Sequence, residues 1–205
     1  MTDGTAPDPV LELVAGIAER GWAVVRHALD AEVARTLREH ALALDARSAF
    51  VPARVGRGAA RTEHADIRGD RIRWLDDTHP DHDEAPALAL LERVRVACNR
   101  KLMLGLFEFE SHFALYPAGA AYARHRDRFR DDDARVLSGV LYLNDGWLPE
   151  HGGALRMHVD DRPPVDVLPE AGTLVAFLSA QLDHEVLPAT RPRLALTGWY
   201  RRRAC

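Results

Sequence analysis

The chain has 205 residues, of which 47% are hydrophobic and 28% charged, and its formal net charge at pH 7 is −4. This composition is ordinary for a globular protein and excludes wholesale disorder. The basic residues are dispersed, which argues against a nucleic-acid partner, and no apolar run approaches the ~18 residues of a membrane span. We therefore expect a single domain over residues 1–205 that binds neither nucleic acid nor membrane.

The amino terminus and the cysteines indicate a cytoplasmic location. The opening sequence MTDGTAPDPV lacks the cationic and apolar regions of a signal peptide. Cys98 lies in a helical pattern, and the other cysteine, Cys205, is the last residue. A disulfide framework is therefore not expected, and a reducing cytosol suits this chain.

The first 105 residues are predicted to form mainly helices. Asp8 is the N-cap of a first helix, Pro9 lies in its first turn, and Gly21 follows its last residue. Asp30 caps a second helix, whose apolar residues recur on one face. The predicted segments are helices over residues 9–20, 31–44 and 85–105, and a short strand over residues 22–29. Residues 46–85 are polar, rich in Gly and Arg, and without a helical period.

From Leu106 onward the hydrophobic period changes to two, which is typical of strands. Turns rich in Gly, Pro, Asp and Asn separate the short segments. Strands are predicted within residues 106–119, 122–127, 135–145, 153–159, 173–179, 184–189 and 193–202. Helices followed by many short strands indicate an α+β protein with a jelly-roll core (a double-stranded β-helix) over residues 106–203 and supporting helices before it. Such a core has room for a site between its two sheets.

Four His-x-Asp pairs occur in the chain, and each could offer an imidazole and a carboxylate side by side on a strand. They are His64–Asp66, His79–Asp81, His125–Asp127 and His158–Asp160. The first lies in the Gly- and Arg-rich stretch, the second contains Pro80, and the fourth runs into the turn DDRPP. These three are expected to be solvated loops or strand ends.

The third pair, His125 and Asp127, leads into a strong strand and has support near the carboxyl terminus. There His184 precedes a strand, and Arg193 opens the next one. Two histidines and one carboxylate form the facial triad that suits non-haem Fe(II). The guanidinium fork of Arg193 suits the far carboxylate of 2-oxoglutarate, although a surface arginine is the alternative.

Several spaced motifs occur in an order that resembles the Fe(II)- and 2-oxoglutarate-dependent prolyl hydroxylases. The likeness covers about residues 55–203 and is greatest to bacterial members similar to the animal oxygen-sensing enzymes. In chain order the motifs are IRGDRIRW (67–74), YP…YARHRD (116–127), LYLN (141–144), GGALR (152–156), HEVLP (184–188) and RLALTGWY (193–200). The resemblance implies His125, Asp127 and His184 as metal ligands, and Fe(II), 2-oxoglutarate and dioxygen as cofactors, with ascorbate as a further candidate.

The resemblance also implies roles for side chains around the metal. Co-substrate binding falls to Arg193, Tyr142, Tyr116, Leu155 and Thr197, and substrate binding to Arg68, Asp70, Arg135 and Trp199. Without the resemblance, Tyr142 would be a half-buried strand tyrosine, and Trp199 and Trp74 core aromatics. Asp70 and Arg135 match a charged pair that links a mobile substrate finger, residues 55–78, to the barrel.

Two positions depart from the animal enzymes. The loop from Tyr116 to Tyr122 is one residue shorter, and His112 replaces a non-ligating apolar residue. By strand parity with Tyr116, His112 faces the pocket, where it either hydrogen-bonds near the iron or packs in the core.

The resemblance implies 4-hydroxylation of a prolyl residue in a protein substrate, with elongation factor Tu as the candidate, and release of succinate and CO2. Asp127, a carboxylate in place of Ala or Gly, favours hydroxylation over halogenation, since no site for a halide remains. Two alternatives stay open. One is a related oxygenase acting on another residue or a free amino acid, and the other is a non-catalytic, metal-binding jelly-roll module.

Overall fold

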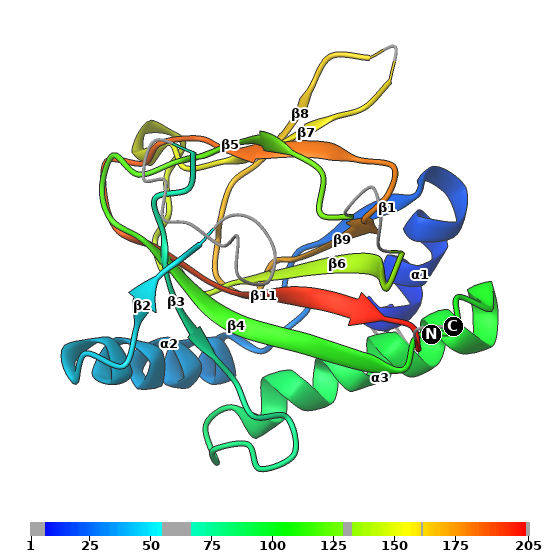
Figure 1. Cartoon of the computed structure of the whole chain (residues 1–205), viewed down its shortest axis with the longest axis horizontal. Helices are drawn as coiled ribbons and strands as arrows, with labels where there is room; N and C mark the ends of the chain where they lie inside the picture. Colours follow the sequence, from blue (N-terminus) through cyan, green and yellow to red (C-terminus); the bar gives the residue numbers. More distant parts are fainter. Residues whose placement is uncertain (1–6, 55–66, 129–132, 161, 204–205) are drawn as a thin grey trace, which may run out of the picture.

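The strands of the computed structural model, which describes residues 7–54, 67–128, 133–160 and 162–203, form two facing sheets (Figure 1). The major sheet has the order β1-β9-β6-β11-β4-β3-β2, and the minor sheet has the order β5-β10-β7-β8. All their pairings are antiparallel. The major-sheet strands are β1 (Trp22–Val25), β2 (Val51–Pro52), β3 (Arg71–Trp74), β4 (Glu108–Tyr116), β6 (Arg135–Tyr142), β9 (Leu174–Leu178) and β11 (Arg193–Arg201). The minor-sheet strands are β5 (Tyr122–His125), β7 (Leu155–His158), β8 (Val165–Val167) and β10 (Asp183–Val186). The predicted jelly-roll core is confirmed.

Three helices precede β4, and the caps of the first two are those that the sequence predicts. In α1 (Pro9–Arg20) the Asp8 carboxylate accepts from the Val10 amide, and Gly21 adopts φ 78° while its N–H donates to the Ile17 carbonyl. In α2 (Ala31–Ala46) the Asp30 carboxylate accepts from the amides of the first turn. The helix α3 (Ala85–Leu102) ends before the predicted Gly105, because Met103 already adopts the left-handed conformation at φ 53°.

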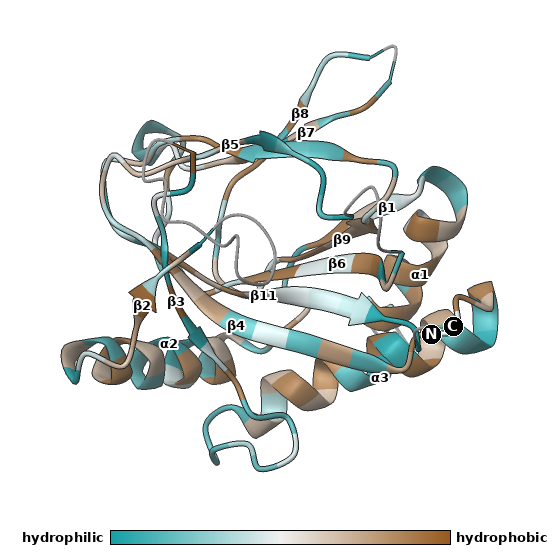
Figure 2. Ribbon diagram, in the orientation of Figure 1, coloured by the Kyte–Doolittle hydropathy of each residue, from teal (hydrophilic) through white to brown (hydrophobic). Residues whose placement is uncertain are grey.

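The helices pack on the outer face of the major sheet, on the side away from the minor sheet (Figure 1). Their apolar stripes face the sheet, and polar residues alternate with them along each helix (Figure 2). One apolar cluster joins all three helices to the major sheet, and a second lies between the two sheets. The helices therefore brace the major sheet from outside and leave its inner face for a site. None of the helices in the described residues is long and apolar enough to cross a membrane.

The segment predicted as a substrate finger is partly built into the sheets. Residues 55–66 lie outside the described residues, but Arg71–Trp74 form β3, which pairs with β4. Just before it, Arg68 forms a bridge with Tyr122, so the segment also closes the free edge of β5. Main-chain hydrogen bonds to β4 and β5 therefore hold residues 67–75 of the predicted mobile finger, although this segment has no apolar period.

Candidate active site

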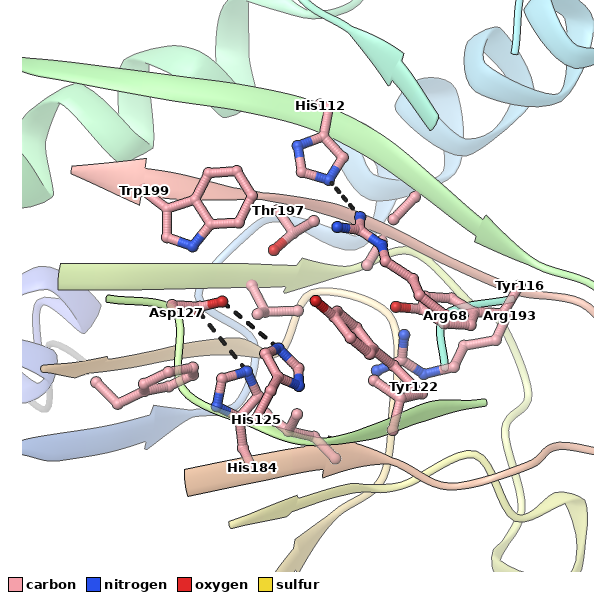
Figure 3. Close-up of a pocket in the computed structure, with 16 residues that line it drawn as sticks. Arg68, His112, Tyr116, Tyr122, His125, Asp127, His184, Arg193, Thr197 and Trp199 are labelled. Atoms are coloured by element: carbon pink, nitrogen blue, oxygen red, sulfur yellow. Dashed lines mark hydrogen bonds and ion pairs between the residues drawn. The ribbon is translucent and has the colours of Figure 1, made fainter. Parts of the chain in front are cut away.

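Three donor side chains meet where β5 ends and β10 begins (Figure 3). His125 ends β5, Asp127 lies two residues beyond it, and β10 places His184 directly opposite His125. Their ligand atoms all lie within 4.8 Å of one another. Asp127 lies in a bend, so it reaches the group by a turn of the chain and not by the strand parity that the sequence predicted.

Backbone carbonyls fix which ring nitrogen of each histidine is available. Nδ1 of His125 lies 2.8 Å from the Ala123 carbonyl oxygen, and Nδ1 of His184 lies 3.3 Å from the Leu182 carbonyl oxygen. A carbonyl oxygen only accepts, so each Nδ1 carries the proton and each Nε2 keeps its lone pair. These Nε2 atoms lie 3.5 and 3.7 Å from oxygens of Asp127, which is the arrangement of a metal-binding group.

The environment keeps Asp127 ionised and His184 neutral, the forms in which they bind metals. Burial alone would raise the pKa of the Asp127 carboxyl, but the adjacent His184 and His125 rings and the Ser138 hydroxyl hold that pKa well below its ordinary value. Burial lowers the pKa of His184, although the Asp127 charge opposes this.

A pocket opens from this group along the inner face of the major sheet. Side chains at alternate positions of β11 share one face, so Arg193, Thr197 and Trp199 all line it. The lining side chains, apart from the three donors, are Arg68, His112, Ala114, Tyr116, Tyr122, Val140, Leu155, Phe177, Val186, Arg193, Ala195, Thr197 and Trp199. Leu155 and Thr197 thus lie on the pocket wall, and the Thr197 hydroxyl donates to the Gly139 carbonyl at 3.1 Å.

Arg193 is buried, with 2% of its surface exposed, at the end of the pocket away from the three donors (Figure 3). Its Nε donates to the Gly153 carbonyl at 2.9 Å, which leaves the terminal guanidinium nitrogens for another acceptor. The guanidinium carbon lies 5.0 Å from the ring centroid of Tyr142 and 5.2 Å from that of Tyr116. The surface alternative for Arg193 is wrong.

The Tyr142 hydroxyl is an unsatisfied buried group in this structure. It is fully buried and makes no hydrogen bond of ordinary geometry within the described residues. Burial raises the pKa of Tyr142, so its hydroxyl is protonated and can donate. A cation and a free donor in one closed pocket fit a carboxylate, and two imidazoles with one carboxylate fit Fe(II). The residues present therefore fit both the metal and 2-oxoglutarate.

Asp70 pairs with Arg68 and not, as predicted, with Arg135. The Arg68 Nε and Nη2 atoms donate to the two Asp70 oxygens at 2.7 and 2.9 Å. Neither Asp70 nor Arg68 is a surface charge, since their side chains are 0% and 11% exposed. Burial alone would lower the pKa of Arg68, but the Asp70 carboxylate more than offsets this and holds it above its ordinary value. Arg68 is the partner of Asp70 because residues two apart in an extended chain point to the same side.

Arg135 instead covers the indole of Trp199, with its guanidinium carbon 3.4 Å from the ring centroid. The guanidinium also lies 3.4 Å from the Asp127 carbonyl oxygen, to which it donates. Trp199 lines the pocket, and Arg135 packs on its ring.

His112 both lines the pocket and packs in the core, so the two alternatives predicted for it are not exclusive. It is 1% exposed, and its ring packs against Trp74 and Trp199 with centroids 4.7 and 5.4 Å apart. Its Nε2 lies 3.5 Å from Nη2 of Arg68 (Figure 3). Burial and the Arg68 charge lower the pKa of His112 to about 3, so the ring is neutral. Trp74 itself is 36% exposed.

A second group of possible donors, His40, Asp81 and Glu84, lies between α2 and the start of α3. Asp81 belongs to the second His-x-Asp pair, for which a loop was predicted. The His40 Nε2 atom lies 3.2 Å from Glu84 Oε1, and the Asp81 amide donates to Glu84 Oε2. These contacts tie α2 to the first turn of α3, and they explain the cluster without an ion.

Sequence reasoning missed three side chains that contact the donors. Tyr122 stacks on His125 with ring centroids 3.7 Å apart, and Phe177 packs on His184 at 4.6 Å. Ser138 donates to Asp127 Oδ2 at 2.6 Å. Strand parity offered a signal for Ser138, which lies four residues before Tyr142 on β6 and so faces the same side. Tyr122 and Phe177 depend on how the two sheets face each other, which local sequence does not encode.

A jelly roll with two imidazoles and one carboxylate facing a buried arginine defines the class of non-haem iron oxygenases. The family model of the 2OG-Fe(II) oxygenase superfamily matches residues 111–201. A solved prolyl-4-hydroxylase from Pseudomonas putida is 47% identical with a TM-score of 0.86, covering 95% of this chain and 100% of that one. This chain belongs to the 2OG-Fe(II) oxygenase superfamily, within its prolyl hydroxylase branch.

Animal prolyl hydroxylases are also similar to this chain. A Trichoplax adhaerens prolyl hydroxylase, solved with a hypoxia inducible factor oxygen degradation domain peptide fragment, shares the fold at 24% identity and a TM-score of 0.85, covering 94% of this chain and 88% of that one. The Caenorhabditis elegans hypoxia-inducible factor prolyl hydroxylase is 29% identical over 199 residues. That match covers 92% of this chain but only 27% of the relative. Members of the superfamily use Fe(II), 2-oxoglutarate and dioxygen.

Proposed function

We propose that this protein is an Fe(II)- and 2-oxoglutarate-dependent dioxygenase that hydroxylates a prolyl residue of a protein substrate. One observation carries the proposal: the metal-binding group and the buried Arg193 share one pocket. His125, Asp127 and His184 would hold the iron. When bound, iron with 2-oxoglutarate and dioxygen supplies the oxidation, in which one oxygen atom enters a C–H bond and the other leaves in succinate with loss of CO2.

The chain's own groups bind and orient the reactants. Arg193 and the Tyr142 hydroxyl would hold the far carboxylate of 2-oxoglutarate, and Leu155, Thr197 and Tyr116 would surround its carbon chain. The apolar walls exclude water, which strengthens each of these contacts. The carboxylate of Asp127 would occupy a coordination position on the iron that a halide would otherwise need.

Two features near the pocket support a segment of protein as substrate. Trp74, which packs on the pocket residue His112, and Ile67, which precedes the pocket residue Arg68, are 36% and 43% exposed, and both suit an apolar ring such as proline. Arg68 and Trp199 line the pocket, Asp70 pairs with the first and Arg135 packs on the second, and this group would contact the residues around the target. Elongation factor Tu is our candidate, on the resemblance to bacterial members. A cytoplasmic location, with ascorbate as a possible reductant there, belongs to the same proposal.

Substitution of the three donors tests the proposal. His125→Ala, Asp127→Ala and His184→Ala should each abolish succinate formation from 2-oxoglutarate, because each removes one of three protein ligands. His79→Ala is the matched control, since His79 belongs to another His-x-Asp pair with an 87% exposed side chain. Near-normal succinate formation by any of the three variants, at saturating iron, would contradict the proposal.

The substrate is tested separately. The protein, reconstituted anaerobically with Fe(II) and 2-oxoglutarate, is exposed to dioxygen with purified elongation factor Tu or with a cell lysate. Mass spectrometry should locate one added oxygen atom on a prolyl residue. Modification of a non-prolyl residue or of a free amino acid would establish the related oxygenase instead. Absence of succinate under all conditions would favour the non-catalytic module.

A further inference from the structure

Two buried serines lie directly behind the Asp127 carboxylate. Ser138 on β6 is 2% exposed, and Ser179, just after β9, is fully buried. The Ser138 hydroxyl lies 2.6 Å from Asp127 Oδ2 and 2.8 Å from the Ser179 hydroxyl. The Ser179 carbonyl accepts from the Arg128 amide, next to Asp127, at 3.2 Å. The two serines therefore hold both the side chain and the main chain of the bend that carries Asp127.

The direction of the hydrogen bonds follows from counting protons. A hydroxyl has one proton to donate, and an ionised carboxylate only accepts. Ser138 must therefore donate to Asp127, and its oxygen accepts the proton of Ser179. The chain of donation runs from Ser179 to Ser138 to Asp127, and each bond polarises the next.

We infer that Ser138 and Ser179 are positioning residues that keep Asp127 a one-oxygen ligand of the iron that our proposed function places here. A carboxylate can bind a metal through one oxygen or through both. Two-oxygen binding would fill a position that 2-oxoglutarate or dioxygen needs. A short hydrogen bond to Oδ2 fixes the rotation of the carboxylate and reserves that oxygen for Ser138.

The first test is the affinity of the folded protein for Fe(II), titrated anaerobically without any turnover. Ser138→Ala should weaken it about 10- to 100-fold, as is usual for partners of metal ligands. Ser138→Thr, which keeps the hydroxyl on a strand, should restore it to near the wild-type value. Ser179→Ala should give a smaller loss, because the Ser138 donor remains. Ser111→Ala is the matched control, since it removes another buried strand hydroxyl that lies 3% exposed on β4.

The second readout is coupling, the ratio of hydroxylated product to succinate. Ser138→Ala should lower this ratio, since a carboxylate free to rotate no longer keeps the dioxygen position open. Fe(II) affinity within twofold of wild type in Ser138→Ala would overturn the inference, as would an equal loss in Ser111→Ala. If Ser138→Ala does not fold, unchanged affinity in Ser179→Ala overturns it. A wild-type protein that binds Fe(II) but forms no succinate would overturn only the proposed function.

Discussion

Arg193 shows how much one buried residue can decide at this site. It is held by the Gly153 carbonyl and lies beside two tyrosines, while Arg191, two residues earlier, lies over Trp147 with its guanidinium carbon 5.1 Å from the ring centroid. Gly153 adopts φ 71°, and a Cβ there would meet Ala189 and Trp147 at 2.9 and 3.0 Å. The tight turn of the GG motif is therefore what brings a carbonyl to Arg193.

Arg193→Ala is expected to raise the KM for 2-oxoglutarate about 10- to 100-fold, because a charge-assisted hydrogen bond to a carboxylate contributes about 1.5–3 kcal/mol. Metal affinity, measured without co-substrate, should stay unchanged. Arg191→Ala is the internal control and should leave the KM as it is. A large KM effect in Arg191→Ala and none in Arg193→Ala would show that our register for β11 is wrong.

At the scale of elements, β5 is held to β10 by few main-chain contacts and by one carboxylate. Its register with β10 is irregular, and Asp183, beside His184, accepts from Arg124 and Arg126, the two neighbours of His125. The bonds from Arg124 Nη2 and Arg126 Nε measure 2.8 and 2.6 Å. One acid therefore joins the strands that carry both histidines.

Asp183→Ala should cost about 1 kcal/mol or less in the free energy of unfolding, because the pairs are largely exposed. It should nevertheless weaken Fe(II) binding several-fold, since the separation of His125 and His184 is no longer fixed. Asp166→Ala, which breaks the bidentate Arg156 pair on the same sheet, is the control. Equal Fe(II) affinities in the two variants would show that Asp183 has no positioning role.

Most elements were predictable, because their signals are local. Asp8, Gly21 and Asp30 cap α1 and α2 where expected, and the long strands around Tyr116, Tyr142 and Arg193 follow the period of two. Strand β8 (Val165–Val167) was missed because three residues after a proline pair carry too little pattern.

The site was predictable where either a motif or strand parity marks the residue. The metal-binding group came from motif spacing, and His112 was correctly placed from its parity with Tyr116. The partner of Asp70 was predicted wrongly, because two arginines compete for one acid and only the folded geometry decides. Ser138 was overlooked because it belongs to no motif, although its parity with Tyr142 placed it on the inner face of β6.

At the scale of the whole molecule, a neutral histidine in the core makes stability depend on pH. Burial next to Arg68 holds the pKa of His112 at about 3, against about 6.5 in an unfolded chain. The unfolded state therefore binds more protons between these values, and stability falls as pH decreases from 6.5 toward 3. The loss is at most about 1.4 kcal/mol per pH unit from this one group.

His112→Gln should flatten that decline in urea unfolding curves measured from pH 7 to pH 4.5, because glutamine does not titrate. His79→Gln, at an 87% exposed position, should keep the wild-type slope. Parallel curves for wild type and His112→Gln would show that His112 is protonated in the folded protein well above pH 3.

The two ends of the pocket belong to different sheets, since the histidines lie on the minor sheet while Arg193 and Tyr142 lie on the major sheet. A dicarboxylic acid bound at both ends of the pocket would therefore extend from one sheet to the other. The packed apolar cluster between the sheets sets the distance between them. This distance would also limit the length of the carbon chain that a bound acid can have. Met157 and Val175, which belong to this cluster but do not line the pocket, would thereby influence which acid fits.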